Sequence, residues 1–462
     1  MFDKALNAAG VLEKASSALG ADGLSSIRYS TTGSEFVLGQ SARPGGRWPQ
    51  YHFDLMITTL NYRDGSWSEE LQGQRVRAEM PPRGGGEPSL PRGTSFGRDG
   101  HVWSQIGPRS IPRPWNVEDR THQVWITPHG LVKAALRNNA SLQWTEEGGK
   151  PFAAVSFTEP GRFSATAFIN EHYQVERVES RVPITYCGEM AFVTAYSGYK
   201  AFGPVAFPGR IQRSQGGFPV LDVVVKDVQA NVALEIEVPD SVKQPRSPMQ
   251  AVKVAEGLFQ IPGSHNCVAI EMQDHIIVVE APLMNSIATA VFEAVKRAVP
   301  GKPITFVINT HHHIDHAGGL RAVLAERATI VTHALNKPLY QRYFAAPGTL
   351  GGPPEASGAV IETVNDTLVI TDGARTVEVH HVSGNNHAED LLMVYLPAEK
   401  ILIEADAYSP GPPNSPPAQE EPFAPNLIEN IERLQLDIER ILPLHGPNVA
   451  LKDLYRAVGK AN

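Results

Sequence analysis

The residues with the clearest chemical meaning are 311–316, which read His-His-His-Ile-Asp-His. They directly follow an apolar, β-branched segment at 304–308 and the pair Asn-Thr, a pattern typical of a buried strand and its end. His311 and His313 are two residues apart, so at an extended strand end their side chains point to the same side and can bind one cation. Imidazole and carboxylate ligands suit zinc, and also manganese or ferrous iron. The segment therefore predicts a metal site, in preference to a surface cluster of histidines.

Asp315 and His316 stand where residues 317–324 are predicted to begin a helix. The turning backbone at this point can direct both side chains to a second metal position beside the first. His312 should point away from the metals, because neighbouring residues of an extended segment face opposite sides. We expect it to pack or to support the ligands.

Three further candidates, His387, Asp406 and His445, each follow a strand-like segment downstream. The segments are 377–382, a hairpin of 391–397 and 400–404, and 440–444. A carboxylate has two oxygens and can bridge two cations, which suits Asp406. The shared order of strand and then ligand predicts that all three bind metal.

This ligand order, His-x-His-x-Asp-His followed by a His, an Asp and a His, resembles the metallo-β-lactamase superfamily over about residues 250–462. The resemblance implies two metals per chain and an αβ/βα sandwich fold. It places the seven ligands in two sets joined by Asp406: His311, His313 and His387 on one metal, and Asp315, His316 and His445 on the other. The set without Cys is similar to that of glyoxalase II and the lactonases. At position 280, where many members carry Asp, this chain has Glu.

The composition is that of a globular enzyme with two domains. The chain has 462 residues, with 42% hydrophobic and 19% charged residues, which exceeds the size of one ordinary core. The net charge of -8 has no long basic run, so we expect no nucleic-acid partner. No apolar run approaches the length of about 20 residues that spans a membrane. The two cysteines, Cys187 and Cys267, make a disulfide framework unlikely to exist. The start of the chain lacks a signal-peptide core, but a removed signal would leave the same sequence, so the location is unknown.

Residues 1–245 are predicted as a mainly antiparallel β domain, and residues 246–462 as the catalytic domain of an α+β protein. In the first half we expect one helix within residues 1–20, another at 128–137, and long loops between Arg77 and Arg113. The expected strands are 27–38, 51–62, 153–157, 164–169, 173–179 and 221–228. His129 is expected to be a core residue with a satisfied hydrogen bond. The half loosely resembles curved open sheets that bind lipids, but a scaffold that supports a homodimer or covers the metal site is favoured.

In the second half, strands are expected at 258–261, 267–272, 276–280 and 328–333, with a helix at 288–299. His333 ends one of these strands, and we expect it to support the site instead of binding metal. The proline-rich run 409–417 is expected to be a loop that shapes the substrate entrance or lies at the surface.

These features predict a dinuclear zinc hydrolase that cleaves a small lactone or ester with a hydroxide supplied by two Zn²⁺ ions, with Mn²⁺ or Fe²⁺ as alternatives. Asp315 is a candidate proton acceptor, and Tyr408 a candidate hydrogen-bond donor to the developing oxyanion. The alternatives are an amide or β-lactam hydrolase, a phosphoester hydrolase, and a mononuclear iron oxygenase of the persulfide type. An alternative of another class is a carrier of apolar ligands with a vestigial metal site, which the complete ligand set disfavours.

Overall fold

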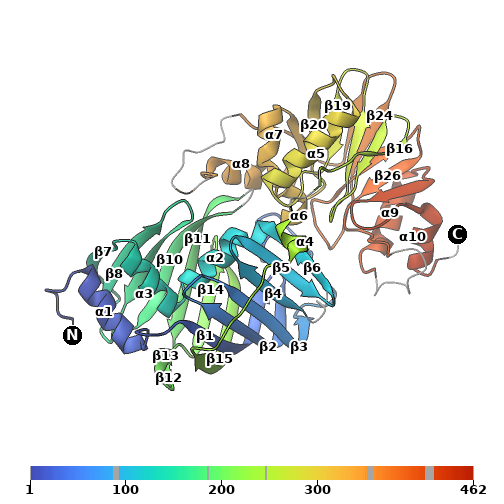
Figure 1. Cartoon of the computed structure of the whole chain (residues 1–462). Coiled ribbons are helices and arrows are strands. Elements are labelled where there is room, and N and C mark those ends of the chain that lie inside the picture. Colours follow the sequence, from blue (N-terminus) through green and yellow to red (C-terminus); the bar gives the residue numbers. More distant parts are fainter. Residues whose placement is uncertain are drawn as a thin grey trace.

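The structure is a computed structural model that describes residues 2–86, 93–184, 187–244, 247–348, 350, 358–411 and 421–460. Within these residues the first half of the chain forms one large sheet with helices, and the second half forms a layered sandwich (Figure 1). The proline-rich run 409–417 lies mostly outside the described residues.

A 13-stranded sheet dominates the first half, in the order β6-β5-β4-β3-β2-β1-β15-β14-β11-β10-β9-β8-β7. Every pairing in it is antiparallel, and burial alternates along strands such as β10, which is typical of a sheet with one covered face. The strands are β1 Ser26–Phe36, β2 Gln50–Asn61, β3 Trp67–Arg77, β4 Thr94–Arg98, β5 His101–Ile106, β6 Arg109–Pro112, β7 Ser141–Glu147, β8 Lys150–Glu159, β9 Phe163–Ile169, β10 Val175–Ile184, β11 Gly188–Ser197, β14 Arg210–Gln215 and β15 Phe218–Ala230. A separate hairpin consists of β12 Lys200–Phe202 and β13 Val205–Phe207.

Three helices, α1 Ala8–Leu19, α2 Val117–Trp125 and α3 Pro128–Arg137, lie together on one face of this sheet (Figure 1). The Asn7 side chain accepts from Gly10 N at the start of α1, and Gly20 ends the helix in the left-handed conformation. α3 has the predicted bounds, with Thr127 as its N-cap. The buried side chains of α1 and α3 join the core of the sheet, so both predicted helices are confirmed.

The prediction of long loops between Arg77 and Arg113 is wrong for the described residues, because β4, β5 and β6 lie there. These short strands form one edge of the sheet, where pairing with β3 holds them. Their packing is long-range: Trp103 of β5 is buried against Ile236, Val238 and Val242 from beyond the end of β15. A local pattern of apolar residues cannot reveal such a contact.

The second half contains two sheets, one of seven strands in the order β16 to β22 and one of six strands in the order β23 to β28. The first consists of β16 Val252–Ala255, β17 Leu258–Ile261, β18 Cys267–Glu271, β19 Ile276–Val279, β20 Ile304–Ile308, β21 Thr329–His333 and β22 Val360–Val364. The second consists of β23 Thr367–Thr371, β24 Thr376–His381, β25 Leu392–Leu396, β26 Ile401–Glu404, β27 Arg440–Pro443 and β28 Val449–Ala450. The helices are α4 Asp240–Lys243, α5 Asn285–Ala298, α6 Ile314–Ala317, α7 Arg321–Glu326, α8 Lys337–Ala345, α9 Ala424–Leu434 and α10 Leu451–Ala457, with short 3-10 turns at Pro114–Asn116 and Ala334–Asn336.

The two sheets pack face to face through a shared apolar core that includes Val279 and Ile308 from one sheet and Val394 and Leu402 from the other. The α5 side chains Val291 and Phe292 pack in a second cluster with Ala269 and Val278, which point to the outer face of the seven-stranded sheet. This layering confirms the predicted αβ/βα sandwich preceded by a mainly antiparallel β region.

The helix expected over residues 317–324 is split into α6 and α7. A Cβ atom on Gly319, between these helices, would lie 2.5 Å from Cβ of Ala288 in α5. The chain therefore passes too close to α5 for any residue but glycine, and the helix is interrupted there.

Residues 231–251 connect the large sheet to β16 and contain only the short α4 among the described residues. The division of the chain at residue 245 stays a prediction. Cys187 and Cys267 are both free and buried, as expected. In the described part of the chain, the helices are too short or too polar to cross a bilayer.

Candidate metal centre

The segment after β20 brings four of the predicted ligands to the end of the first sheet of the sandwich. β20 lies between β19 and β21 with parallel pairing on both sides. His313 then forms the N-cap of α6, with an extended backbone, and Asp315 lies in the first turn of that helix. The side chains of His311, His313 and His316 are fully buried here.

The other three predicted ligands come from the second sheet, each just after a strand. Asp406 follows β26 and His445 follows β27, which pair in parallel, so both residues leave the same edge of the sheet. His387 lies in the loop between β24 and β25, where its backbone N–H donates to Asn385 Oδ1 at 2.8 Å. The predicted pattern of strand and then ligand is present at all three positions.

The structure brings all seven predicted ligands together in two adjoining groups. Ligand atoms of His311, His313, His387 and Asp406 all lie within 4.8 Å of one another. A second group, within the same limit, contains Asp315, His316, His445 and also His265.

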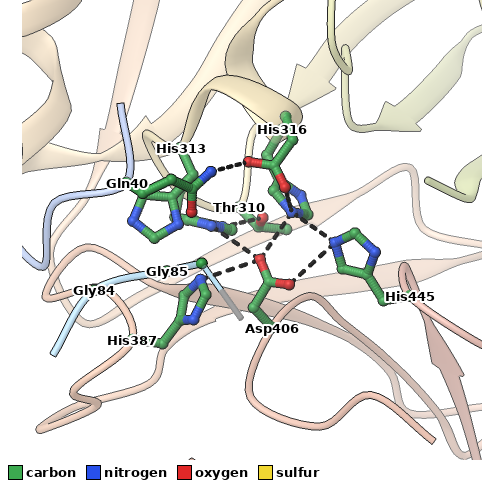
Figure 2. A network of polar contacts seen from close by, with 12 residues as sticks. Gln40, Gly84, Gly85, Thr310, His313, His316, His387, Asp406 and His445 are labelled. Atoms are coloured by element: carbon green, nitrogen blue, oxygen red, sulfur yellow. Dashed lines mark hydrogen bonds and ion pairs between the residues drawn. The ribbon is translucent and has the colours of Figure 1, made fainter. Parts of the chain in front are cut away.

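Asp406 lies between the two groups (Figure 2). Its Oδ2 lies 3.1 Å from His311 Nε2, 3.2 Å from His387 Nε2 and 2.8 Å from His316 Nε2. Its Oδ1 lies 3.0 Å from His445 Nε2. One carboxylate therefore contacts imidazoles of both groups, which is the position expected of a bridging ligand.

The buried atoms at this centre fit a metal better than they fit one another. Five of them have no hydrogen-bond partner: Nε2 of His311, Nδ1 of His313, Nδ1 of His316, Nε2 of His387 and Oδ2 of Asp406. Moreover, Nε2 of His316 lies 3.0 Å from Nε2 of His445, although two neutral imidazole nitrogens that both act as acceptors repel each other. Buried polar atoms are almost always paired, so this unpaired set of nitrogen and oxygen donors matches divalent cations.

The local electrostatics keep the donors in the forms that bind metal. Burial, with a further effect of nearby His316, lowers the pKa of His311 to about 4, and burial likewise holds the pKa of His313 well below its usual value. These imidazoles are therefore neutral. Burial alone would raise the pKa of Asp406, but the imidazoles of His316 and His445 hold it well below its usual range. Metal ligands must be deprotonated, as these are.

Buried polar side chains fix the ligand segment in place. Glu280, fully buried at the end of β19, accepts from the backbone N–H of Thr310 at 3.0 Å and from the Thr310 hydroxyl. Its Oε1 also lies 3.6 Å from Nδ1 of His316. Asn309 Nδ2 donates to the carbonyl of His311 at 2.8 Å. Glu280, which differs from the residue of many family members, thus supports a ligand from behind.

The residues predicted to support the site are placed as follows. His312 is buried, and its backbone N–H and Nδ1 lie 2.8 and 2.7 Å from the carboxylate of Asp390. His333 is buried, stacks on His381 at 4.3 Å and accepts from Leu335 N. Tyr408 is 5% exposed within the apolar core between the sheets, and its role as a hydrogen-bond donor stays a prediction.

Two contacts of the centre were not predicted from the sequence. His265, in the loop between β17 and β18, lies 3.2 Å from Asp315 Oδ2 through its Nε2. Gln40, from the first half of the chain, donates from Nε2 to Asp315 Oδ1 at 2.6 Å. His265 follows no strand, and Gln40 is not a usual metal ligand, so no local signal marked either residue.

With this geometry established, comparisons with known proteins bear on the class of the site. Residues 261–445 match the family model of the metallo-beta-lactamase superfamily. A linear primary-alkylsulfatase of a Pseudomonas species is 32% identical over 76 residues, which are 16% of this chain and 11% of that relative. The chain thus matches only a small part of that relative's length.

Solved structures of the same class align with less than half of this chain. A metallo-beta-lactamase from Pontibacter korlensis is 17% identical, with a TM-score of 0.37 over 46% of this chain and 97% of that one. The sec-alkylsulfatase Pisa1 from a Pseudomonas species is 18% identical, with a TM-score of 0.34 over 45% of this chain and 40% of that one. Residues 261–445 form a domain of the metallo-β-lactamase superfamily, and the large sheet precedes it as an additional region.

Proposed function

We propose that this protein is a metal-dependent hydrolase that holds two cations and cleaves an ester bond in a small molecule. The observation that supports it most is the position of Asp406, whose two oxygens contact imidazoles of two adjoining ligand groups. The unpaired buried donor atoms around it support the same conclusion. We further propose residues 246–462 as the catalytic domain.

The ligand sets follow the two groups in space. One cation would be held by His311, His313 and His387, and the other by Asp315, His316 and His445, with Asp406 shared. Zinc is the proposed cation, since nitrogen and oxygen donors suit it, and manganese or iron are the alternatives. When bound, two such cations supply Lewis acidity that lowers the pKa of water and polarises the substrate oxygen.

Asp315 is better suited to binding metal than to accepting a proton. Burial would raise its pKa, but His316 and His265 hold the pKa well below the usual value, so the carboxyl group is ionised at neutral pH. Its Oδ1 accepts from Gln40 and its Oδ2 faces His265. A weakly basic carboxylate with both oxygens engaged is a poor proton acceptor, so the ligand role has the stronger support.

The exposure of the ligands indicates the side from which a substrate arrives. The side chains of His311 and His316 are 0% exposed, whereas those of Asp315 and His445 are 26% and 22% exposed. A substrate therefore reaches the centre beside His445 and Asp315. His265, whose ring lies 4.5 Å from that of His445, is at this entrance.

Two kinds of ester are proposed as substrate. Carboxylic esters and lactones follow from the ligand set, which has no Cys. Sulfate esters follow from the matched relative, a linear primary-alkylsulfatase. Amides, β-lactams and phosphoesters rank below both, because neither the ligand set nor that relative favours them.

The test combines metal analysis with a panel of substrates on the full-length protein. We expect close to two cations per chain after gentle purification, and hydrolysis of a carboxylic ester, a lactone or a primary alkyl sulfate that stops when a chelator removes the metal. A β-lactam and a phosphodiester serve as comparison substrates. Folded protein that binds one cation or none would contradict the dinuclear centre, and turnover of the phosphodiester alone would contradict the proposed substrate class.

A further inference from the structure

We propose that the first half of the chain completes the metal centre: residues 39–42 and 84–85 position His313 and Asp315 from across the boundary between the halves. This inference rests on the proposed function, because it concerns the ligands of the same centre. Figure 2 shows Gln40, Gly84 and Gly85 beside the ligands of the second half.

The carbonyl of Ser41 selects the nitrogen with which His313 can bind metal. Nε2 of His313 lies 2.8 Å from Ser41 O. A carbonyl only accepts hydrogen bonds, so Nε2 carries the proton and Nδ1 is the unprotonated nitrogen. That Nδ1 is buried and has no hydrogen-bond partner, as expected of a ligand atom. A partner of this kind orients a metal-binding histidine and fixes its tautomer.

The hydroxyl of the same residue holds the neighbouring histidine. Ser41 Oγ lies 3.0 Å from Nε2 of His312, whose other ring nitrogen contacts Asp390. Ser41 itself is 2% exposed. One residue of the first half thus fixes two successive positions of the ligand segment.

Gln40 acts on the second ligand group through its amide. Its Nε2 can only donate, and it does so to Asp315 Oδ1 at 2.6 Å. Gln40 is 8% exposed, so little water competes for this bond. Because His265 contacts the other oxygen of Asp315, the carboxylate is held between one residue of each half.

A glycine loop of the first half fixes Gln40 in turn. Gly85 N donates to Gln40 O at 3.0 Å, and Gly84 N donates across the boundary to Asn386 O at 2.8 Å, next to His387. Arg77 Nη1 donates to the carbonyl of Gly85 at 3.1 Å and so anchors the loop to β3. A Cβ atom on Gly85 would lie 1.8 Å from Gln40 Oε1 and 2.9 Å from His313 Cε1. Only glycine leaves room for both side chains at this point.

The first experiment is the variant Gln40→Met, which keeps the length of the side chain but removes the donor. We expect the affinity for one of the two cations to fall about tenfold or more, the effect typical of losing a hydrogen-bond partner behind a ligand. Affinities are measured by chelator competition with Co²⁺ on full-length metal-free protein, together with the visible absorption spectrum of bound Co²⁺. The Tm of the metal-free variant should equal that of the wild type.

The matched control is Gln72→Met. Gln72 donates to the carboxylate of Glu70 at 2.8 Å on the exposed side of β2 and β3, so it loses the same kind of bond away from the centre. We expect this control to bind Co²⁺ as the wild type does.

The second experiment is Gly85→Ala, with Gly358→Ala as its control, because a Cβ atom on Gly358 meets nothing within 4 Å. The new methyl group should displace the Gln40 amide and crowd His313, so both affinities should fall and the Co²⁺ spectrum should change. In the double variant with Gln40→Met, the two losses at the Asp315 position should not add, because both remove the same contact.

The outcomes separate this inference from the proposed function. Wild-type protein that binds two cations, with unchanged affinities and spectra in Gln40→Met and Gly85→Ala, would overturn the inference and leave the proposed function intact. Wild-type protein that binds no cation would overturn both.

Discussion

Replacing Asp406 with Asn should separate the two cations energetically while it preserves the shape of the site. The substitution keeps the size of the side chain and removes one negative charge that contacts four imidazoles, three at Oδ2 within 3.2 Å and one at Oδ1 at 3.0 Å. A cation bound by those nitrogens must lie within about 4 Å of the carboxylate. At an effective dielectric constant near 20, the attraction of one unit charge at that distance is about 4 kcal/mol.

A loss of about 4 kcal/mol corresponds to about a thousandfold weaker binding of the less tightly held cation. Chelator competition on metal-free protein measures this change, and metal analysis after dialysis should fall from two cations per chain toward one. Hydrolysis should fall by orders of magnitude while circular dichroism stays unchanged. The control is Asp437→Asn, an exposed carboxylate paired with Lys400 at 2.9 Å, for which we expect no change in metal content. Two tightly bound cations in Asp406→Asn would refute the assignment of Asp406 as the bridge.

Three further predictions concern the surroundings of the centre and the first half. His265→Gln should weaken the binding of one cation if His265 is a ligand, and should change only turnover if it merely contacts the substrate; chelator competition distinguishes these results, and no change in either would exclude both roles. Asp390→Asn should lower the free energy of unfolding by about 1–3 kcal/mol, measured in urea, because it disturbs a buried acceptor of two bonds from His312. Burial lowers the pKa of His129 to about 4, so its contribution to stability is complete above about pH 6.5 and is lost as the pH falls toward 4. At pH 5 this loss is about 2 kcal/mol, which should be absent in His129→Gln; equal pH dependence of both proteins would contradict it.

The second half could be predicted well because its signals are local. Its strands are short and fully apolar, as in β19 and β25, and each ends just before a polar residue that takes part in the centre. Buried strands of this kind are recognisable from composition alone. The ligand positions then followed from one repeated pattern, in which a strand is followed by a histidine or an aspartate.

The first half was predicted less completely, because many of its strands carry polar residues on their solvated face. β3 includes Glu69, Glu70 and Gln72, yet it lies inside the sheet between β2 and β4. Its place is set by pairing and by contacts such as that of Glu69 with Arg120 of α2. Strand formation that depends on neighbours in the sheet leaves a weak signal in the sequence. The core role expected of His129 is confirmed, since it is fully buried and lies 2.9 Å from the carbonyl of Leu19.

The contacts of Gln40 and Ser41 with the centre could not be predicted for a different reason. Gln40 is 275 residues from Asp315, and Ser41 acts on His313 through its backbone carbonyl, an atom that every residue possesses. Neither the residue type nor the spacing therefore carries the information. The expectation that the second half contains all the chemistry identified the residues that would bind metal, but it missed the groups that orient them. A hydrolase site of this kind depends on both, because a ligand in the wrong tautomer or rotamer is no ligand at all.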